Sequence, residues 1–388
     1  MSHKIVLPRM LETGAGAITK LPPMLETLQC KRPLIVTDQV MVSLGYVDLL
    51  LKILEEAGLE SGLFTGTEPE PTEQSLWPAV EQLRNGHFDS VVALGGGSAI
   101  DSAKAIAVLA HHGGCMADYK VPRDVVEAGV PVIAIPTTAG TGSEVTRFTI
   151  ITNGDTDEKM LCMGLAFMPY AAIIDYELTL SAPPRITADT GIDALTHGIE
   201  AYVSQKANPF SDQQALAAIA LLAPNLRRVY HSPEDREARE AMMLGSTLAG
   251  IAFSNASVAL VHGMSRPIGA HFHVPHGLSN AMLLPVVTRF SIPGAPERYA
   301  QCARTMGVAS KEDSDETANE KLLAELCALN QELLVPSMTA FGINKARFME
   351  LRELMAEQAL ASGSPGNNPR VPSQSEIAEL YIQTWNQE

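Results

Sequence analysis

The sequence predicts an α/β domain with a parallel sheet over residues 1–182, followed by an all-helical domain over residues 183–388. In the first half, continuous apolar runs rich in valine and isoleucine alternate with helical patterns, as is typical of parallel strands covered on both faces. After about Pro183 the apolar spacing approaches 3.6 residues and β-branched clusters become rare. The consecutive prolines Pro183 and Pro184 break helices and stiffen a connection, so we expect the boundary there.

The individual elements follow from the same patterns. Residues 33–38, 90–94 and 130–136 are short apolar runs bounded by polar or glycine residues, and each is expected to be a strand. Helical patterns follow the first run as far as about Glu56, and the second over residues 99–110. In the second half we expect helices over residues 186–204, 212–230 and 233–252, and in the segments after Pro296 and Asp315.

Composition narrows the possible function classes. The chain has 388 residues, of which 46% are hydrophobic and 19% charged, so wholesale disorder is excluded. Its formal net charge of −16 repels nucleic acid and anionic membranes, and we expect neither as a partner. No apolar run reaches the roughly 20 residues that span a bilayer, and the N-terminus lacks the pattern of a signal peptide. Five scattered cysteines without a CxxC pair fit free thiols in a reducing cytoplasm.

Two loops that follow predicted strands favour a nucleotide. Gly95-Gly96-Gly97-Ser98 precedes a helix, where glycines let a phosphate approach free backbone N–H groups. Alone this is weak, because such turns often serve only chain reversal. Residues 136–144 interleave small hydroxyl residues with glycine after another strand, and parallel strands bring both loops to one sheet edge. Asp38 ends the first strand, where a carboxylate can bind ribose hydroxyls and repel a 2′-phosphate, or simply cap a turn.

The second half contains a candidate metal site. Asp193 and His197 lie four positions apart on an expected helix, so both side chains share one face. His262 and His276 stand in apolar, glycine-containing surroundings, and four of the ten histidines fall between 262 and 276. Any one histidine is more often structural than a ligand. Three imidazoles and one carboxylate nevertheless suit Fe(II) or Zn(II). His271 and His273 have no equally good assignment and are interpreted as structural, or as residues that support the metal ligands from behind.

These motifs together resemble the iron-containing (group III) alcohol dehydrogenases over nearly the whole chain. The matching pieces are Gly95–Ser98 with Asp101 and Lys104, then residues 136–144, 191–204, 275–280 and 284–285, and Asn368-Pro369-Arg370. Residues 191–204 are the most specific of them. The resemblance implies a Rossmann-like nucleotide-binding domain and a helical domain, the dehydroquinate-synthase-like fold, and a homodimer or higher homo-oligomer.

The resemblance also implies roles for individual residues. Asp193, His197, His262 and His276 match the family's four metal ligands, and His276 is also a candidate catalytic residue together with Arg266. The side chains and loop residues expected to contact the cofactor, NAD(H), are Asp38, Gly96, Gly97, Ser98, Asp101, Thr137, Thr138, Thr141, Ser143 and Lys159.

Two positions depart from the family pattern. Arg266 stands where many members carry a histidine that takes part in proton relay, and arginine cannot shuttle a proton at neutral pH. A guanidinium there could clamp a carboxylate or phosphonate on the substrate. A structural ion pair with an acidic residue is the competing interpretation. Glu70 stands where relatives often have asparagine near the cofactor.

The sequence therefore predicts an oxidoreductase that transfers a hydride between NAD(H) and a small primary alcohol or aldehyde, including one with an anionic group. The metal is Fe(II) or Zn(II), since both accept imidazole and carboxylate ligands. A polyol dehydrogenase and a hydroxyacid–oxoacid transhydrogenase of the same fold are the alternatives among enzymes. Outside enzymes, the alternative is a nucleotide-binding regulator with a structural metal.

Overall fold

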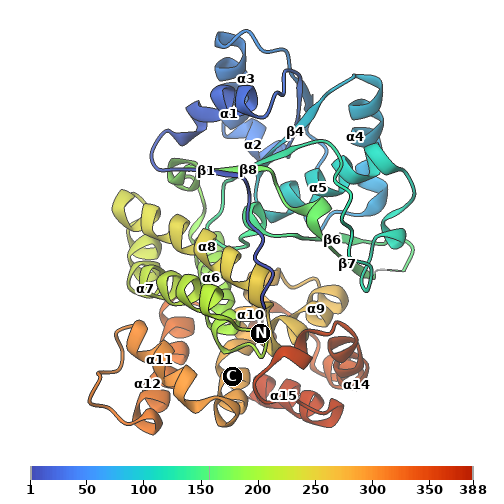
Figure 1. Cartoon of the computed structure of the whole chain (residues 1–388). Helices are drawn as coiled ribbons and strands as arrows, with labels where there is room; N and C mark the ends of the chain where they lie inside the picture. Colours follow the sequence, from blue (N-terminus) through green and yellow to red (C-terminus); the bar gives the residue numbers. More distant parts are fainter. Residues whose placement is uncertain (1, 157, 387–388) are drawn as a thin grey trace. The chain divides into compact units, whose positions relative to one another are not determined.

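The computed structural model describes residues 2–156 and 158–386 (Figure 1). The chain divides into two compact units. One is Val6–Ala182, and the other runs from Pro183 onward and includes the first residues up to Ile5. Each unit has its own class of secondary structure.

The unit Val6–Ala182 is built on a six-stranded sheet in which every neighbouring pair is parallel. This confirms the predicted parallel sheet. The strand order is β1-β8-β5-β4-β2-β3. Central strands β2, β4 and β5 are buried throughout, which is why they read as unbroken apolar runs. The bounds are β1 Met10–Thr13, β2 Pro33–Val36, β3 Gly62–Phe64, β4 Ser90–Gly95, β5 Val132–Pro136 and β8 Ala171–Ile174.

Helices cover both faces of this sheet. Alternate strand residues such as Ile35, Leu94 and Ile135 share a core cluster with Leu25 and Leu50, which belong to α1 and α3. The opposite face packs against α5, which contacts β2, β4 and β5. Each fully buried leucine in such a core contributes about 1.5–3 kcal/mol through removal of its surface from water. The helices are α1 Leu21–Thr27, α2 Gln39–Ser43, α3 Tyr46–Glu56, α4 Glu73–Asn85 and α5 Gly97–His112.

Several elements of this unit were not predicted. The single helical pattern after β2 is two helices, because Gly45 adopts φ +78° between α2 and α3. The sheet gains β1, β3 and β8, of which β1 and β3 are partly exposed edge strands without a continuous apolar run and β8 is a short buried strand. An antiparallel pair, β6 Phe148–Thr152 and β7 Lys159–Met163, forms a separate two-stranded sheet. Strands of this length show only two or three periods of alternation, so sequence patterning discriminates them poorly.

The second unit is helical: no strand occurs in residues 183–386, all of which the structure describes. Helix α6 is buried on every side from Gly191 to Val203 and packs against α7, α8 and α10. This confirms the predicted helical domain. The helices are α6 Pro184–Val203, α7 Pro209–His231, α8 Arg236–Ala256, α9 Leu260–Phe272, α10 His276–Ser291, α11 Pro296–Thr305, α12 Asp315–Glu332, α13 Met338–Phe341, α14 Lys345–Ala361 and α15 Gln374–Asn386.

A sharp bend separates α8 from α9, and it determines where α9 begins. Ser257 adopts φ +72° directly after α8, and the two helix axes meet at 102°. Within the part of the chain that the structure describes, no single helix has both the length and the apolar composition to cross a membrane. Together, α8 and α9 pass that test as a bent pair, on length and composition alone.

Candidate functional site

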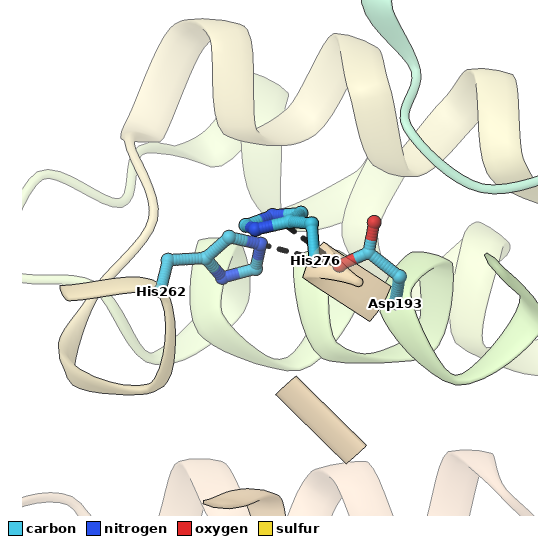
Figure 2. A group of neighbouring side chains, drawn as sticks. All are labelled: Asp193, His262 and His276. Carbon is cyan, nitrogen blue, oxygen red and sulfur yellow. Dashed lines mark ion pairs between the residues drawn. The ribbon is translucent and has the colours of Figure 1, made fainter. Parts of the chain in front are cut away.

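Three predicted metal ligands from three helices converge in the helical unit (Figure 2). Asp193 belongs to α6, His262 to the first turn of α9, and His276 to the first residue of α10. Their ligand atoms all lie within 4.8 Å of one another. Nε2 of His262 is 3.4 Å from Asp193 Oδ1, and Nε2 of His276 is 3.9 Å from the same oxygen. Asp193 and His262 are buried, whereas the side chain of His276 is 40% exposed, so the cluster is open on its His276 side.

His197, the fourth predicted ligand, is buried beside this cluster but is not one of the three converging groups. Its ring stacks on that of His262, with centroids 4.4 Å apart and planes inclined by 25°. The other stacking partner is Phe253 of α8, at 4.3 Å. The structure therefore places His197 next to the three ligands and leaves its role as a ligand a prediction.

Glu200 holds His262 from the side opposite the cluster. Its carboxylate accepts a hydrogen bond from His262 Nδ1 at 2.6 Å. It also accepts from the backbone N–H groups of Ala259 at 2.9 Å and Val261 at 2.6 Å, at the start of α9. These N–H groups have no partner within the helix, so a carboxylate there caps the helix and complements its dipole. One buried carboxylate thus fixes both the beginning of α9 and the ring of His262.

Asn280 closes the cluster from α10, one turn after His276. Its amide Nδ2 donates to Asp193 Oδ1 at 2.6 Å and lies 3.2 Å from Nε2 of both His262 and His276. Its Oδ1 is buried without a hydrogen-bond partner. The amide nitrogen therefore sits among the same atoms that would surround a cation.

The electrostatics of the cluster favour an ionised aspartate. Burial alone would raise the pKa of Asp193, but the neighbouring His197, His276 and His262 hold it far below the usual range. Burial alone would lower the pKa of His262, but the carboxylates of Glu200 and Asp193 overcome it and raise that pKa to about 9. Without a cation, His262 is therefore the proton-bearing partner between two carboxylates at neutral pH.

Arg266, the predicted catalytic arginine, lies on α9 one turn after His262. Its Nη1 donates to the hydroxyl of Ser364 at 3.0 Å, and its Nε is buried without a partner. The two unassigned histidines point elsewhere: His271 contacts Gln358 Oε1 at 2.8 Å, and His273 ends α9 in a left-handed conformation with φ +53°. Neither belongs to the converging group, and their interpretation as structural or supporting residues stays a prediction.

In the other unit, the strand order creates the kind of point where α/β proteins bind ligands. After β2 the chain continues to β3 on one side, whereas after β4 it continues to β5 on the other. Ligands of open α/β sheets bind beyond the carboxyl ends of two such strands. Asp38 follows β2 there, and Gly95–Ser98 follow β4. A Cβ built on Gly95, whose φ is +148°, would lie 3.5 Å from Asp38 Oδ2.

The Asp38 carboxylate also has a structural function. Its Oδ1 accepts from the N–H groups of Val40 at 2.8 Å and Met41 at 3.0 Å, and so caps α2. A turn-capping role and a ribose-binding role were alternatives in the sequence. The cap is present, and the second carboxylate oxygen takes no part in it.

The glycine loop before α5 packs closely on the loop after β5. A Cβ on Gly97 would approach the Thr141 side chain to 2.8 Å, and one on Gly96 would meet Thr138 at 3.5 Å. Close approach of the two loops is therefore a sufficient reason for glycine at position 97. Gly96, Gly97 and Ser98 are partly exposed at the first turn of α5, as are Thr138 and Thr141, whereas Thr137 is buried.

Asp101 on α5 and Ser143 in the loop after β5, both predicted cofactor residues, bind each other. Asp101 accepts from Ser143 Oγ at 2.6 Å and from the Ile150 N–H at 2.9 Å. The buried ammonium of Lys104 donates to Ser143 Oγ at 2.9 Å and to the carbonyl oxygens of Thr146 and Phe148. The polar atoms of Asp101 and Ser143 are thus engaged within the protein. Their direct contact with a cofactor stays a prediction.

Lys159, another predicted cofactor residue, forms an ion pair with Glu70. Its Nζ lies 2.8 Å from Glu70 Oε1. Glu70 adopts φ +52°, a conformation that asparagine tolerates better than glutamate. Glu70 therefore gives Lys159 a charged neighbour in this chain.

Comparison with known proteins decides the family. The description "Iron-containing alcohol dehydrogenase" matches residues 8–176, and "Fe-containing alcohol dehydrogenase family, C-terminal" matches residues 187–385. The chain belongs to the iron-containing alcohol dehydrogenase family. The 1,3-propanediol dehydrogenase of Klebsiella pneumoniae is 36% identical over 391 residues, covering 99% of this chain and 100% of that protein. This confirms the resemblance stated above and makes the chain an oxidoreductase.

Solved structures of family members agree with the fold. The crystal structure of a 1,3-propanediol oxidoreductase matches with a TM-score of 0.95 and 36% identity, covering 99% of this chain and 100% of the other. A sulfoacetaldehyde reductase from Bifidobacterium kashiwanohense, solved in complex with NAD+, matches with a TM-score of 0.89 and 27% identity over the full length of both chains.

The donor set of this chain fits the metal that the family name implies. A buried carboxylate and two imidazole nitrogens are acceptable ligands for Fe(II) and Zn(II), and no thiol belongs to the cluster. The hydrogen bond from His262 Nδ1 to Glu200 leaves Nε2 as the nitrogen that faces Asp193. The orphaned Oδ1 of Asn280 shows in addition that the polar groups here are not fully satisfied among themselves.

Sequence analysis named neither Glu200 nor Asn280 as a functional residue. Helical spacing could have found both: Glu200 lies seven residues after Asp193, and Asn280 lies four residues after His276. Each shares a helix face with a predicted ligand. Nothing in the sequence distinguishes them from other polar residues at such spacings.

Proposed function

We propose that this member of the iron-containing alcohol dehydrogenase family transfers a hydride between NAD(H) and a small primary alcohol or aldehyde in a metal-dependent reaction. The observation that carries the proposal is the convergence of Asp193, His262 and His276 from three helices. A buried carboxylate kept ionised by adjacent imidazoles is suited to a divalent cation. Its burial costs desolvation free energy, which a purely structural role would not require.

Asp193, His197, His262 and His276 are the proposed ligands of Fe(II) or Zn(II). When bound, such an ion supplies Lewis acidity toward the oxygen of the substrate. Asp193 contributes the negative charge, and Glu200 orients the ring of His262 and fixes its tautomer. His276 is the most exposed of the three converging ligands, so we place the substrate on its side and retain it as a catalytic residue.

The proposed cofactor residues are those at the carboxyl ends of β2, β4 and β5. Asp38, Gly96, Gly97, Ser98, Thr138 and Thr141 are accessible there, and the first turn of α5 offers N–H groups to a diphosphate. The Asp38 carboxylate disfavours a 2′-phosphate, which supports NAD over NADP. The NAD+ complex of the sulfoacetaldehyde reductase is consistent with this choice.

Arg266 does not replace the family histidine as a proton carrier. Burial lowers its pKa only to about 10, so the guanidinium keeps its proton at neutral pH. We assign it to substrate binding.

The decisive experiment is oxidation of NADH by metal-stripped protein, with Fe(II) or Zn(II) restored without oxygen, across neutral and anionic short aldehydes. Turnover that returns with the metal supports the proposal. The variant Asp193→Asn should bind metal weakly and stay inactive, whereas Asp313→Asn, which disrupts a surface ion pair with Lys321, should behave as the wild type. No turnover with either metal and any aldehyde would overturn the proposal in favour of the transhydrogenase alternative.

We further propose that the protein acts in the cytoplasm as a homodimer or larger homo-oligomer. All five cysteines are free, which fits a reducing compartment. Light scattering of the purified protein tests the oligomeric state, and fractionation of the source cells tests the compartment.

A further inference from the structure

Arg266 is a half-buried cation without a counter-ion, and its Nε atom is fully buried. Its guanidinium has one hydrogen bond, to the neutral hydroxyl of Ser364, and its Nε has none. Across residues 2–156 and 158–386, no carboxylate lies within ion-pair distance of it. The structural ion pair considered from the sequence is therefore not found. Withdrawing an unpaired charge from water is costly, and a charge in such a place is ordinarily paired or bound by a ligand.

Glu200 is the acidic residue whose charge acts on Arg266, but its carboxylate is already hydrogen-bonded to other groups. Its charge acts on Arg266 at longer range. Both of its oxygens already accept hydrogen bonds, Oε1 from the Val261 N–H and Oε2 from the Ala259 N–H and His262 Nδ1. Its donors are fixed by the start of α9, so it cannot turn toward the guanidinium without exposing them. Among the described residues, no carboxylate therefore pairs with the guanidinium of Arg266 through two parallel hydrogen bonds.

The position of Arg266 relates it to the proposed reaction centre. It lies four residues after His262 on α9, hence on the same helix face and about 6 Å further along the axis. Long helical side chains usually lean toward the N-terminus of their helix, which for Arg266 is the direction of the turn that carries His262. The Nη1 group is held by Ser364, at the start of a short 3₁₀ helix at Ser364–Asn367.

We propose that Arg266 and Ser364 form an anion-binding subsite, and that the substrate is a short aldehyde or alcohol carrying a carboxylate, phosphonate or sulfonate. This deepens the proposed function and rests on it for the reacting end of the molecule. The guanidinium supplies two parallel N–H donors to the acid group, and the serine hydroxyl supplies a third. The acid group thus sets the distance and direction at which the reacting carbon is presented.

The test compares two aldehydes of equal chain length, anionic 4-oxobutanoate and neutral butanal. The wild type should prefer 4-oxobutanoate in kcat/KM. In Arg266→Met the ratio of the two kcat/KM values should fall roughly 10- to 100-fold, the loss expected for hydrogen bonds to a charged group. Arg266→Lys keeps the charge but not the fork, and should be intermediate. The control is Arg239→Met, since Arg239 is an arginine of the same unit that is likewise bonded to a hydroxyl, that of Thr187, and the ratio should not change.

A binding measurement separates failure of the subsite from failure of the proposed function. Calorimetric titration of metal-free, cofactor-free protein with 4-hydroxybutanoate, and with 1-butanol as reference, does not depend on turnover. Binding of the anion alone that is lost in Arg266→Met supports the subsite even if no aldehyde is reduced. Equal binding of both compounds, or unchanged anion binding in the variant, overturns it even if hydride transfer is observed. Melting temperatures verify that each variant is folded.

Discussion

Glu200 accepts a 2.6 Å hydrogen bond from Nδ1 of His262, while the other ring nitrogen of His262 lies 3.4 Å from Asp193 Oδ1. The imidazole is thus held between two buried carboxylates from the same helix, α6. Carboxylate–histidine pairs of this kind fix the ring and its tautomer in metal sites. The relationship makes Glu200 a positioning residue, and the first prediction concerns it.

Replacing Glu200 by glutamine should weaken metal binding roughly 10- to 100-fold. A glutamine side chain offers one oxygen and one NH2 group, so it cannot accept from both the backbone N–H groups and His262 Nδ1. If its NH2 group faces Nδ1, the ring proton must move to Nε2, which then cannot bind a cation. Dialysis against a competing chelator measures the affinity.

The matched control is Glu325→Gln. Glu325 lies in the same unit and pairs with Arg227, and its loss should leave the metal affinity unchanged. A Glu200→Gln protein that melts normally and retains the wild-type affinity would contradict the positioning role. Loss of stability in Glu200→Gln without any change in metal affinity would reduce Glu200 to a helix cap.

Binding of the metal should release a proton, and the metal affinity should increase as the pH rises. Without a cation, burial works against protonation of His262, but Glu200 and Asp193 raise its pKa to about 9. Below that pH a cation competes with the imidazolium proton, so affinity increases from about pH 6 to about pH 9 and then levels off. The proton released on adding Zn(II) to weakly buffered metal-free protein is the direct measurement. An affinity that does not vary with pH in this interval would contradict it.

Lys104 should make the free energy of unfolding increase with pH. This side chain is fully buried, and burial lowers its pKa from 10.5 to about 8, against the opposing effect of Asp101 and Glu144. Between these values the unfolded chain binds a proton that the folded chain does not, so raising the pH favours the folded state. The gain over this window is about 3 kcal/mol, at about 1.4 kcal/mol per pKa unit.

Urea unfolding at several pH values tests this sign. Lys104→Met should lack the increase, although it also loses the hydrogen bonds from the ammonium to Ser143, Thr146 and Phe148. Lys52→Met is the control, because Lys52 is exposed on α3 beside Glu56 and should keep the wild-type slope. Wild-type stability that falls relative to Lys104→Met between about pH 8 and 10.5 would refute the argument.

The sequence predicted the central part of this fold and less of its periphery. Strands β2, β4 and β5 are buried on both faces, so their apolar runs were unambiguous, whereas the edge strands have three or four residues and show no such run. His262 and His276 could be predicted because histidines in apolar surroundings are rare, and Asp193 because it shares a helix face with His197. Lys104 shows what could not be predicted: its partners are backbone carbonyls and hydroxyls about forty residues away, and only the packed structure brings them together.

Asp38 should determine the choice between NAD and NADP, and Asp38→Ser is the variant that isolates this role. Serine can still cap α2 by accepting from the N–H groups that Asp38 now binds, so the helix is retained while the negative charge is removed. With the repulsion of a 2′-phosphate gone, the ratio of kcat/KM for NADPH to that for NADH should rise at least roughly tenfold, equivalent to about 1.4 kcal/mol. Asp48→Ser, in the first turn of α3, is the control for a general loss of acidic charge. An unchanged cofactor ratio in a normally folded Asp38→Ser protein would leave Asp38 as a helix cap only.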